Sequence, residues 1–221
     1  MKKLPRQFYN RHTIDVALDL LGCRIICNTG GIKTGGMIVE VEAYHGPTDP
    51  ACHAFHGRTP RNEVMHGPPG FLYVYFTYGN HFMLNVVTER DNFPAAVLLR
   101  GIEPLYNIPV MAKRRGTDDF TNISSGPGKL AKALDVTRID NGTDLLGSHI
   151  YFQGPSEGRF EIMASPRIGI GNNGIEKLWR FFIKDNPHVT PSNKFTRESN
   201  YPVKRARKLN WNLPLDRLLK K

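Results

Sequence analysis

Apolar and polar residues alternate strictly in one stretch of the chain, from Met37 to Tyr44. A two-residue period is typical of a β-strand with two different faces. One face carries Met37, Val39, Val41 and Ala43, and the other carries Ile38, Glu40, Glu42 and Tyr44. A carboxylate is costly to bury unless it is paired or used, so a glutamate on this strand is a candidate for function. Glutamate is equally ordinary on an exposed sheet face, and the alternation alone does not separate the two interpretations.

The same kind of pattern predicts the elements around this strand. Residues 13–22 predict a helix with Thr13 as its N-cap and Gly22 at its end, and a glycine-rich turn after residues 23–28 predicts a hairpin into the central strand. Further strands are expected at residues 71–77, 82–87, 95–100 and 178–183, and a second helix is expected to begin near residue 128 with Ser124 or Ser125 as its cap. Together they predict an α+β fold: a single domain with a curved, mainly antiparallel β-sheet flanked by helices and long loops.

A long loop follows the central strand, from residue 45 to residue 70. Connections of this length are generally either functional or disordered, and the prolines and side-chain donors in this one favour an ordered loop. Cys52, His53 and His56 have the composition of a metal site, but their spacing matches no zinc motif. We therefore expect no metal and no other cofactor.

Composition narrows the class of protein. The chain has 221 residues, 40% of them hydrophobic and 23% charged, which suits one sizeable globular domain. It has no apolar run of about 18 residues that could span a bilayer, and its first residues lack the apolar core of a signal peptide. Three irregularly spaced cysteines suit a reducing compartment. We expect no membrane association, a monomer, and location in the cytoplasm with the nucleoid in a bacterium or in the nucleus of a eukaryote.

The net charge of +10 favours a polyanionic partner such as nucleic acid. The excess is concentrated at the end, because residues 194–221 hold nine Lys or Arg against two acids. We divide the chain into one domain over residues 1–190 and a basic C-terminal extension over residues 191–221 that is free to pack on it. Candidates for contacts to a DNA backbone are Lys113, Arg114, Arg115, Lys129 and the extension, although each cation alone could equally belong to a solvated face.

Aromatic residues dominate the predicted strand at residues 71–77, with Tyr75 inside it and Tyr78 in the turn that follows. Such strands usually belong to a core, but tyrosines near a turn can also stack on a flat ring or wedge into a base stack. Arg100 ends an apolar strand, where a cation needs a partner or an anionic ligand. The Gly128-Lys129 helix start would suit a phosphate, but the chain lacks the nucleotide-binding GxxxxGK[ST] pattern.

Six blocks of sequence match one family in order and spacing over about residues 12–185. They are IVEVEAYHGPTDPACHA, TPRN, PGFLYVYFTYG, LLRGIEP, SGPGKL and PRIGIG. They resemble the alkyladenine (3-methyladenine) DNA glycosylases, monofunctional enzymes of base excision repair. Several independent blocks in register are a more specific signal than any single motif. The resemblance, and not the strand pattern, favours a functional glutamate. It also implies that residues 1–190 are a glycosylase domain.

The resemblance implies a role for each matching residue. Glu42 would be the general base that activates water, with Arg100 beside it or near a phosphate. The family's other positions imply a pocket lined by Tyr44, His53 and Tyr75, a base-screening group at Asn85, and a wedge that fills the gap in the duplex at Tyr78. Asn80 and His81, after the wedge turn, are more polar than the family pattern leads us to expect, which puts the grip on the duplex there in doubt.

The implied activity is excision of alkylated or deaminated purines from double-stranded DNA, leaving an abasic site. Flipping a nucleotide out of the duplex costs a few kcal/mol, which stacking on aromatic rings offsets. A cationic methylated purine leaves without protonation, so one carboxylate suffices to orient water and stabilise the oxocarbenium-like sugar. A lyase needs an amine nucleophile, and residues 37–99 contain no lysine, so we expect hydrolysis only.

Two other interpretations remain open from the sequence. A non-enzymatic DNA clamp would use the aromatic strands and the basic extension, and it would bind intact and damaged DNA equally well. A metal hydrolase would use His53, His56 and Glu42 as ligands. The sequence does not indicate which damaged bases are preferred.

Overall fold

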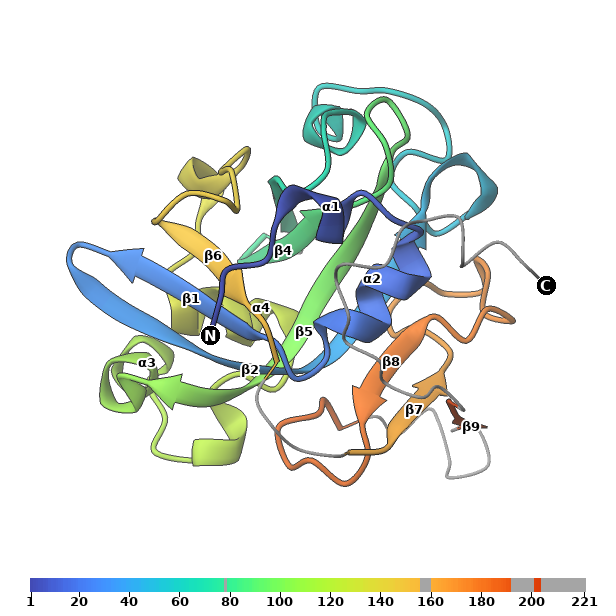
Figure 1. Cartoon of the computed structure of the whole chain (residues 1–221). Coiled ribbons are helices and arrows are strands. Elements are labelled where there is room, and N and C mark those ends of the chain that lie inside the picture. The colour runs from blue at the N-terminus through green and yellow to red at the C-terminus, as the bar shows by residue number, and fades with distance from the viewer. Residues whose placement is uncertain (78, 156–159, 192–200, 204–221) are drawn as a thin grey trace.

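The computed structural model describes residues 1–77, 79–155, 160–191 and 201–203. Within these residues nine strands form one sheet in which every pairing is antiparallel. The strand order is β3-β4-β5-β2-β8-β7-β9, while β1 pairs with β2 and β6 pairs with β1 (Figure 1). The α+β fold class with a mainly antiparallel sheet is confirmed. No helix among the described residues has the length and apolar character that crossing a bilayer requires.

The predicted strands are present, and two of them are longer than expected. The strands are β1 Arg24–Thr29, β2 Ile32–His45, β3 Leu72–Thr77, β4 His81–Val87, β5 Ala95–Tyr106, β6 Ile150–Gln153, β7 Ile162–Ser165, β8 Arg180–Ile183 and β9 Tyr201–Pro202. The helices are α1 Arg6–Tyr9, α2 Thr13–Leu20, α3 Ile108–Arg115 and α4 Pro127–Leu134, with 3₁₀ turns at Gly46–Thr48, Glu63–His66, Phe120–Asn122 and Arg138–Asp140. The helices α1 and α3 and the strands β6, β7 and β9 were not predicted. In the basic extension, β9 pairs with β7.

The long strand β2 holds the sheet together because it has different partners along its length. It pairs with β5 from Gly35 to His45, with β1 in its first half and with β8 in its second half. The β1–β2 hairpin turns at Gly30 and Gly31, whose φ angles of 56° and 78° explain why both positions are glycine. The glutamates of β2 therefore lie between β5 and β8.

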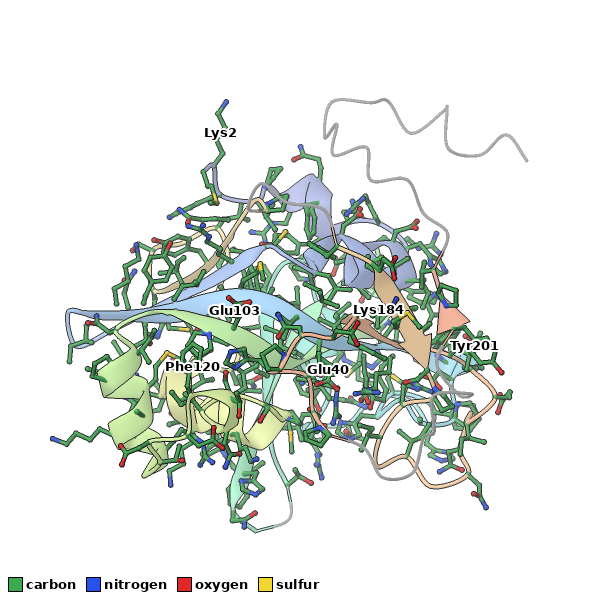
Figure 2. The ribbon with its side chains drawn as sticks, turned by 90° about the horizontal axis from the view of Figure 1, so that it is seen from below. Lys2, Glu40, Glu103, Phe120, Lys184 and Tyr201 are labelled. Atoms are coloured by element: carbon green, nitrogen blue, oxygen red, sulfur yellow. The ribbon has the colours of Figure 1, made fainter. Side chains whose placement is uncertain are left out.

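Helices cover both faces of the sheet: α1 and α2 lie over one face, and α3 and α4 over the other (Figures 1 and 2). The N-termini of α2 and α4 differ from expectation. Thr13 is the first residue of α2 and not its cap, and its backbone N–H donates to the Glu89 carboxylate at 2.6 Å. Gly126 is the cap position of α4, because the Ser124 hydroxyl is used on the carbonyl of Ile102 at 2.6 Å. Both N-cap predictions were wrong because Thr13 and Ser124 bind groups that lie far from them in the sequence.

One apolar core joins α2, the sheet and α4. It includes Val39, Val41 and Ala43, the apolar face predicted for the central strand, and their side chains are fully buried. Removing a valine side chain from water contributes roughly 1.5–3 kcal/mol. The opposite face of β2 is buried as well, although it carries carboxylates: Glu40 and Glu42 are both fully buried. The sequence left open whether the face of β2 that carries the glutamates is exposed to solvent. The structure shows that this face is buried.

A β-bulge places Arg100 opposite these carboxylates. Glu40 pairs with Gly101 and Val41 pairs with Leu99, so Arg100 has no direct partner on β2 and the register shifts there. Bulges re-aim side chains and are common beside active sites. Gly101, next to Arg100, has no room for a side chain, because a Cβ at this position would lie 2.7 Å from the backbone oxygen of His188.

We predict that Gly101→Ala destabilises the fold by about 1–3 kcal/mol, because the methyl group forces the backbone near His188 to move. Urea denaturation measures the change in free energy of unfolding. Gly67→Ala is the matched control, since its added Cβ comes no closer than 3.4 Å to any neighbour outside its adjoining residues. Equal stability of the two variants would contradict the close approach at Gly101.

Candidate active site

A cleft of about 570 Å³ opens beside the ends of β2, β3, β4 and β5. The volume is in the usual range for a small-ligand site. Ring-bearing side chains form much of its wall, and its lining includes Tyr44, His53, His56, Tyr73, Tyr75, Asn85, Arg100, Pro127 and residues 168–170. The lining therefore combines segments from the whole length of the domain.

The long loop after β2 forms one wall of the cleft, and it is ordered as predicted. A small apolar cluster of Cys52, Ala54 and Met65 packs against the sheet residues Tyr73, Val87 and Ala96. Buried Asn62 fastens the loop, because its amide donates to the carbonyls of His53 and Gly57 at 2.9 Å each. Its side-chain oxygen accepts from the backbone N–H of Thr59 at 2.7 Å. The loop thus holds His53 in a fixed place.

Three groups from the cleft wall converge on the Glu42 carboxylate. The Tyr44 hydroxyl donates to Oε2 at 2.8 Å, the backbone N–H of Ile168 donates to Oε1 at 2.7 Å, and Arg100 Nη1 lies 3.2 Å from Oε1. Each of these partners presents a hydrogen, which suits an ionised carboxylate. Glu42 is fully buried and lies behind the lining residues rather than among them. The three residues that hold Glu42, which are Tyr44, Arg100 and Ile168, themselves line the cleft.

Glu40 lies deeper and binds two arginines. Arg100 Nε and Arg180 Nε donate to its Oε1 at 2.8 and 2.7 Å, and the backbone N–H of Thr190 donates to Oε2 at 2.6 Å. Figure 2 shows Glu40 in the interior of the molecule. Burial alone would raise the pKa of Glu40, but the two guanidinium groups and Thr190 outweigh it and hold the pKa below the usual value. Burial alone would lower the pKa of Arg100, but the neighbouring Glu42 and Glu40 carboxylates outweigh this effect and raise it.

A second buried ion pair supports the outer part of the site. Arg167 binds Asp49 through two hydrogen bonds of 2.5 and 2.7 Å, and both side chains are fully shielded from solvent. The Arg167 guanidinium lies 4.7 Å from the ring centre of Tyr44, and its next residue, Ile168, supplies the N–H that binds Glu42. Burial and the neighbouring Glu42 keep the pKa of Tyr44 well above its usual value, so its hydroxyl remains a donor.

The outer rings of the cleft pack edge to face. The centres of His53 and Tyr75 are 4.4 Å apart, and His53 Nδ1 lies 3.0 Å from the hydroxyl oxygen of Tyr73. Arg61 covers Tyr75 at 5.2 Å from its ring centre. The pKa of His53 lies below its usual 6.5, because the surrounding rings desolvate the imidazolium and Arg61 repels it. A neutral imidazole therefore faces the cleft at neutral pH.

The structure brings most of the predicted site residues together. Tyr44, His53, Tyr75, Asn85 and Arg100 line the one cleft, and Glu42 contacts two of them. The Asn85 amide donates to the carbonyl of Tyr73 at 3.1 Å. Tyr78 lies outside the described residues. The roles of these residues in catalysis and base recognition stay predictions.

The predicted phosphate-binding cations are placed less uniformly. Lys129 follows Pro127, a cleft residue, and binds the side chain of Asn122. Lys113 is exposed on α3. Arg114 points to the other end of α4, where it donates to the carbonyl of Ala133 at 3.1 Å, so its guanidinium is used inside the domain. Their contact with DNA stays a prediction.

Sequence reasoning gave no role to four residues that build the site. Asp49 and Arg167 lie in blocks that matched the family, but their pairing joins residues far apart in the chain. Arg180 was assigned only to a core strand, and Glu40 was noted without a partner. The sequence could have identified Arg180 as a candidate in the same way as Arg100, because each is a charged residue in an otherwise apolar strand. Among the described residues, His53, His56 and Glu42 do not form a group with metal-ligand geometry.

We predict that Asp49→Asn lowers the free energy of unfolding by about 3–5 kcal/mol, because it leaves the Arg167 charge buried without its counter-ion. Urea denaturation measures the loss. Glu161→Gln removes an exposed partner of Lys184 and serves as the control, with no change expected. If Asp49→Asn were as mild as the control, the Arg167 guanidinium would have to be solvated in solution.

Histidine titration by NMR tests the electrostatics of the cleft. We predict a pKa below 6.5 for His53 and above 6.5 for His149, whose Nε2 lies 2.7 Å from an Asp140 carboxylate oxygen. Arg61→Ala should raise the pKa of His53 towards 6.5 and leave that of His149 unchanged. A His53 that titrates above 6.5 would show that the rings and Arg61 do not surround it as described.

Comparison with known proteins places this site in a family. The model of the family described as "Methylpurine-DNA glycosylase (MPG)" matches residues 7–187. A protein of Alkaliphilus oremlandii named "Putative 3-methyladenine DNA glycosylase" is 42% identical over 199 residues, covering 85% of this chain and 98% of its own length. Proteins with the same name from Chlorobaculum parvum and Methanocella arvoryzae are 46% and 44% identical, each covering 86% of this chain and 91% and 96% of their own lengths.

The match covers the strands β1 to β8, the long loop and every segment that lines the cleft. The resemblance found in the six sequence blocks is confirmed, and the interpretations as a passive clamp or a metal hydrolase lose their basis. The chain belongs to the methylpurine-DNA glycosylase family and is a DNA glycosylase of DNA repair.

Proposed function

We propose that this protein flips alkylated or deaminated purines out of duplex DNA into the cleft and hydrolyses the N-glycosidic bond with a water activated by Glu42, leaving an abasic site. The observation that carries the proposal is the buried Glu42 carboxylate, held by Tyr44, Arg100 and Ile168 at the back of a ring-lined cleft. This arrangement supplies a negative charge and stacking surfaces in one place, which are the two needs of the reaction.

The carboxylate has an acceptor position left for a water. An ionised carboxylate offers about four acceptor positions, and the three partners of Glu42 occupy at most three of them. A water on the remaining position would be oriented towards the cleft, and Glu42 would take its proton as it attacks C1′ of the sugar. Arg100 would position the Glu42 carboxylate for this step, since its Nη1 lies 3.2 Å from Oε1, and Glu40 fixes Arg100 in place.

The walls suit a flat, electron-poor base. Tyr44, His53 and Tyr75 would stack on the extruded purine, and Asn85 would discriminate between bases by the groups at their edges. A neutral His53 adds no charge to repel a cationic methylated purine. Tyr78 would fill the gap in the duplex, and Lys113, Arg114 and Lys129 are the proposed backbone contacts.

We further propose that the protein acts as a monomer and has no lyase activity. A lyase forms a Schiff base between an amine and the sugar. Among the described residues, the cleft wall includes no lysine, and Lys129 is bound to Asn122 beside it. The reaction should therefore stop at the abasic site.

We predict that Glu42→Gln lowers the rate of base release from a 3-methyladenine or hypoxanthine duplex roughly 10²–10⁴-fold, because the general base is lost. Affinity for the lesion duplex should be retained, since the rings of the cleft are unchanged. Single-turnover chromatographic assays of released base, with a parallel binding assay, measure the two quantities.

Glu161→Gln, an exchange of the same kind on an exposed side chain, is the control and should excise normally. Excision by Glu42→Gln at close to the normal rate would remove Glu42 from the chemistry. Strand cleavage at the abasic site by the wild-type protein, without added base, would contradict hydrolysis alone.

A further inference from the structure

Three potential metal ligands meet away from the cleft. His12 lies just before α2, His45 is the last residue of β2, and Glu89 lies in the connection from β4 to β5. One ligand atom from each lies within 4.8 Å of the other two. Two imidazoles and a carboxylate are the donor set of many zinc sites. No residue of this group belongs to the cleft wall.

The distances between the donors suit a small cation. Zinc bonds to nitrogen and oxygen of about 2.0–2.2 Å place the ligands of a tetrahedral site about 3.3–3.5 Å apart. His45 Nε2 and Glu89 Oε1 already lie 3.4 Å apart. The rings of His12 and His45 are neighbours, with their centres 4.9 Å apart. His12 is exposed, so its side chain can rotate to close the remaining distance.

Thr48 orients His45 for binding. The Thr48 hydroxyl donates its hydrogen to the carbonyl of His45 at 3.0 Å, so its oxygen is left to accept from His45 Nδ1–H, also at 3.0 Å. In the neutral imidazole this tautomer leaves a lone pair on Nε2, directed at Glu89. Two acceptor atoms then face each other, and either a proton or a cation between them is required to make the contact favourable. A fixed Nδ1–H is also the usual outer partner of a metal-bound histidine.

Thr13 holds Glu89 in place through Oε1, the same oxygen that lies near His45 Nε2, so Oε2 is the oxygen left to bind an ion. Among the described residues, both hydrogen bonds from Thr13 end on Oε1, at 2.6 and 2.8 Å. The positive end of α2 disfavours a nearby cation. The charge of the Glu89 carboxylate offsets it, and the ligand bonds are much stronger. The balance therefore favours the cation.

We propose that His12, His45 and Glu89 bind one divalent transition-metal ion of the zinc class, with water completing its coordination. The ion fastens the start of α2 and the β4–β5 connection to the end of β2. Alternation along β2 points His45 away from the face that carries Tyr44, so the ion stabilises the fold and takes no part in base release.

Isothermal titration of the chelator-treated full chain with Zn²⁺, in a buffer that does not bind metal, tests the site. One equivalent should bind saturably, and the melting temperature should rise with Zn²⁺ concentration. His12→Ala should weaken binding roughly 100-fold or more, because loss of even an outer partner of a metal ligand costs 10–100-fold. Because His12 is exposed, the His12→Ala variant should fold. A melting temperature in the absence of metal equal to that of the wild-type chain would confirm that it does.

His56→Gln changes an exposed histidine of the cleft wall and is the matched control, with binding expected to stay unchanged. No saturable binding by the wild-type chain, or equal binding by the wild-type and His12→Ala chains, would overturn the proposal and leave a proton between His45 and Glu89. Loss of binding in His56→Gln would move the metal to the cleft and overturn it equally.

Discussion

The site depends on the neutralisation of buried charge. Glu40, Glu42, Arg100 and Arg180 form one connected group whose charges sum to zero, and all four side chains are at least 95% shielded from solvent. An isolated charge in such surroundings would cost several kcal/mol, so each member requires the others. Glu40 is the centre of the group, because it accepts from both arginines and from the backbone of Thr190. It thereby fixes Arg100, which in turn contacts Glu42. Glu40 therefore holds the carboxylate proposed for catalysis indirectly, through Arg100.

The sheet explains how these residues meet. In the order β5-β2-β8, the central strand β2 carries both glutamates and each neighbouring strand carries one arginine. Arg180 stands directly opposite Glu42 in the β2–β8 register, yet its side chain binds Glu40. Arg100 comes within reach of both glutamates because the bulge in β5 removes it from the regular register. Each neighbouring strand thus supplies one arginine to the same Glu40 oxygen, and this shared partner joins the two ion pairs into one network.

Much of the fold could be predicted from the sequence, because periodicity reports which side of a strand is apolar. The strands of the β2, β3, β4 and β5 region follow directly from it. The pairing of Arg167 with Asp49, the bulge at Arg100 and the capping of α2 by Glu89 could not be predicted. Each of these features joins segments that are distant in the chain, and no local sequence pattern indicates which distant residues will come into contact. The same limit applies to the site: alternation put two glutamates on one face, while the resemblance alone selected Glu42.

The charge balance also bears on which bases the cleft can favour. The buried network and the Arg167–Asp49 pair each have no net formal charge, and His53 is neutral, so an entering base would meet no excess charge of either sign on the inner wall as a whole. Discrimination must then come from the rings and from edge contacts. Arg61 lies over Tyr75 and, in the proposed function, would compete with a cationic purine for the electron density of that ring. Tyr44 is approached in the same way by Arg167. Rings that are already paired with guanidinium groups gain less from a charged base, so a cleft of this kind discriminates less sharply between charged and neutral purines than uncovered tyrosines would.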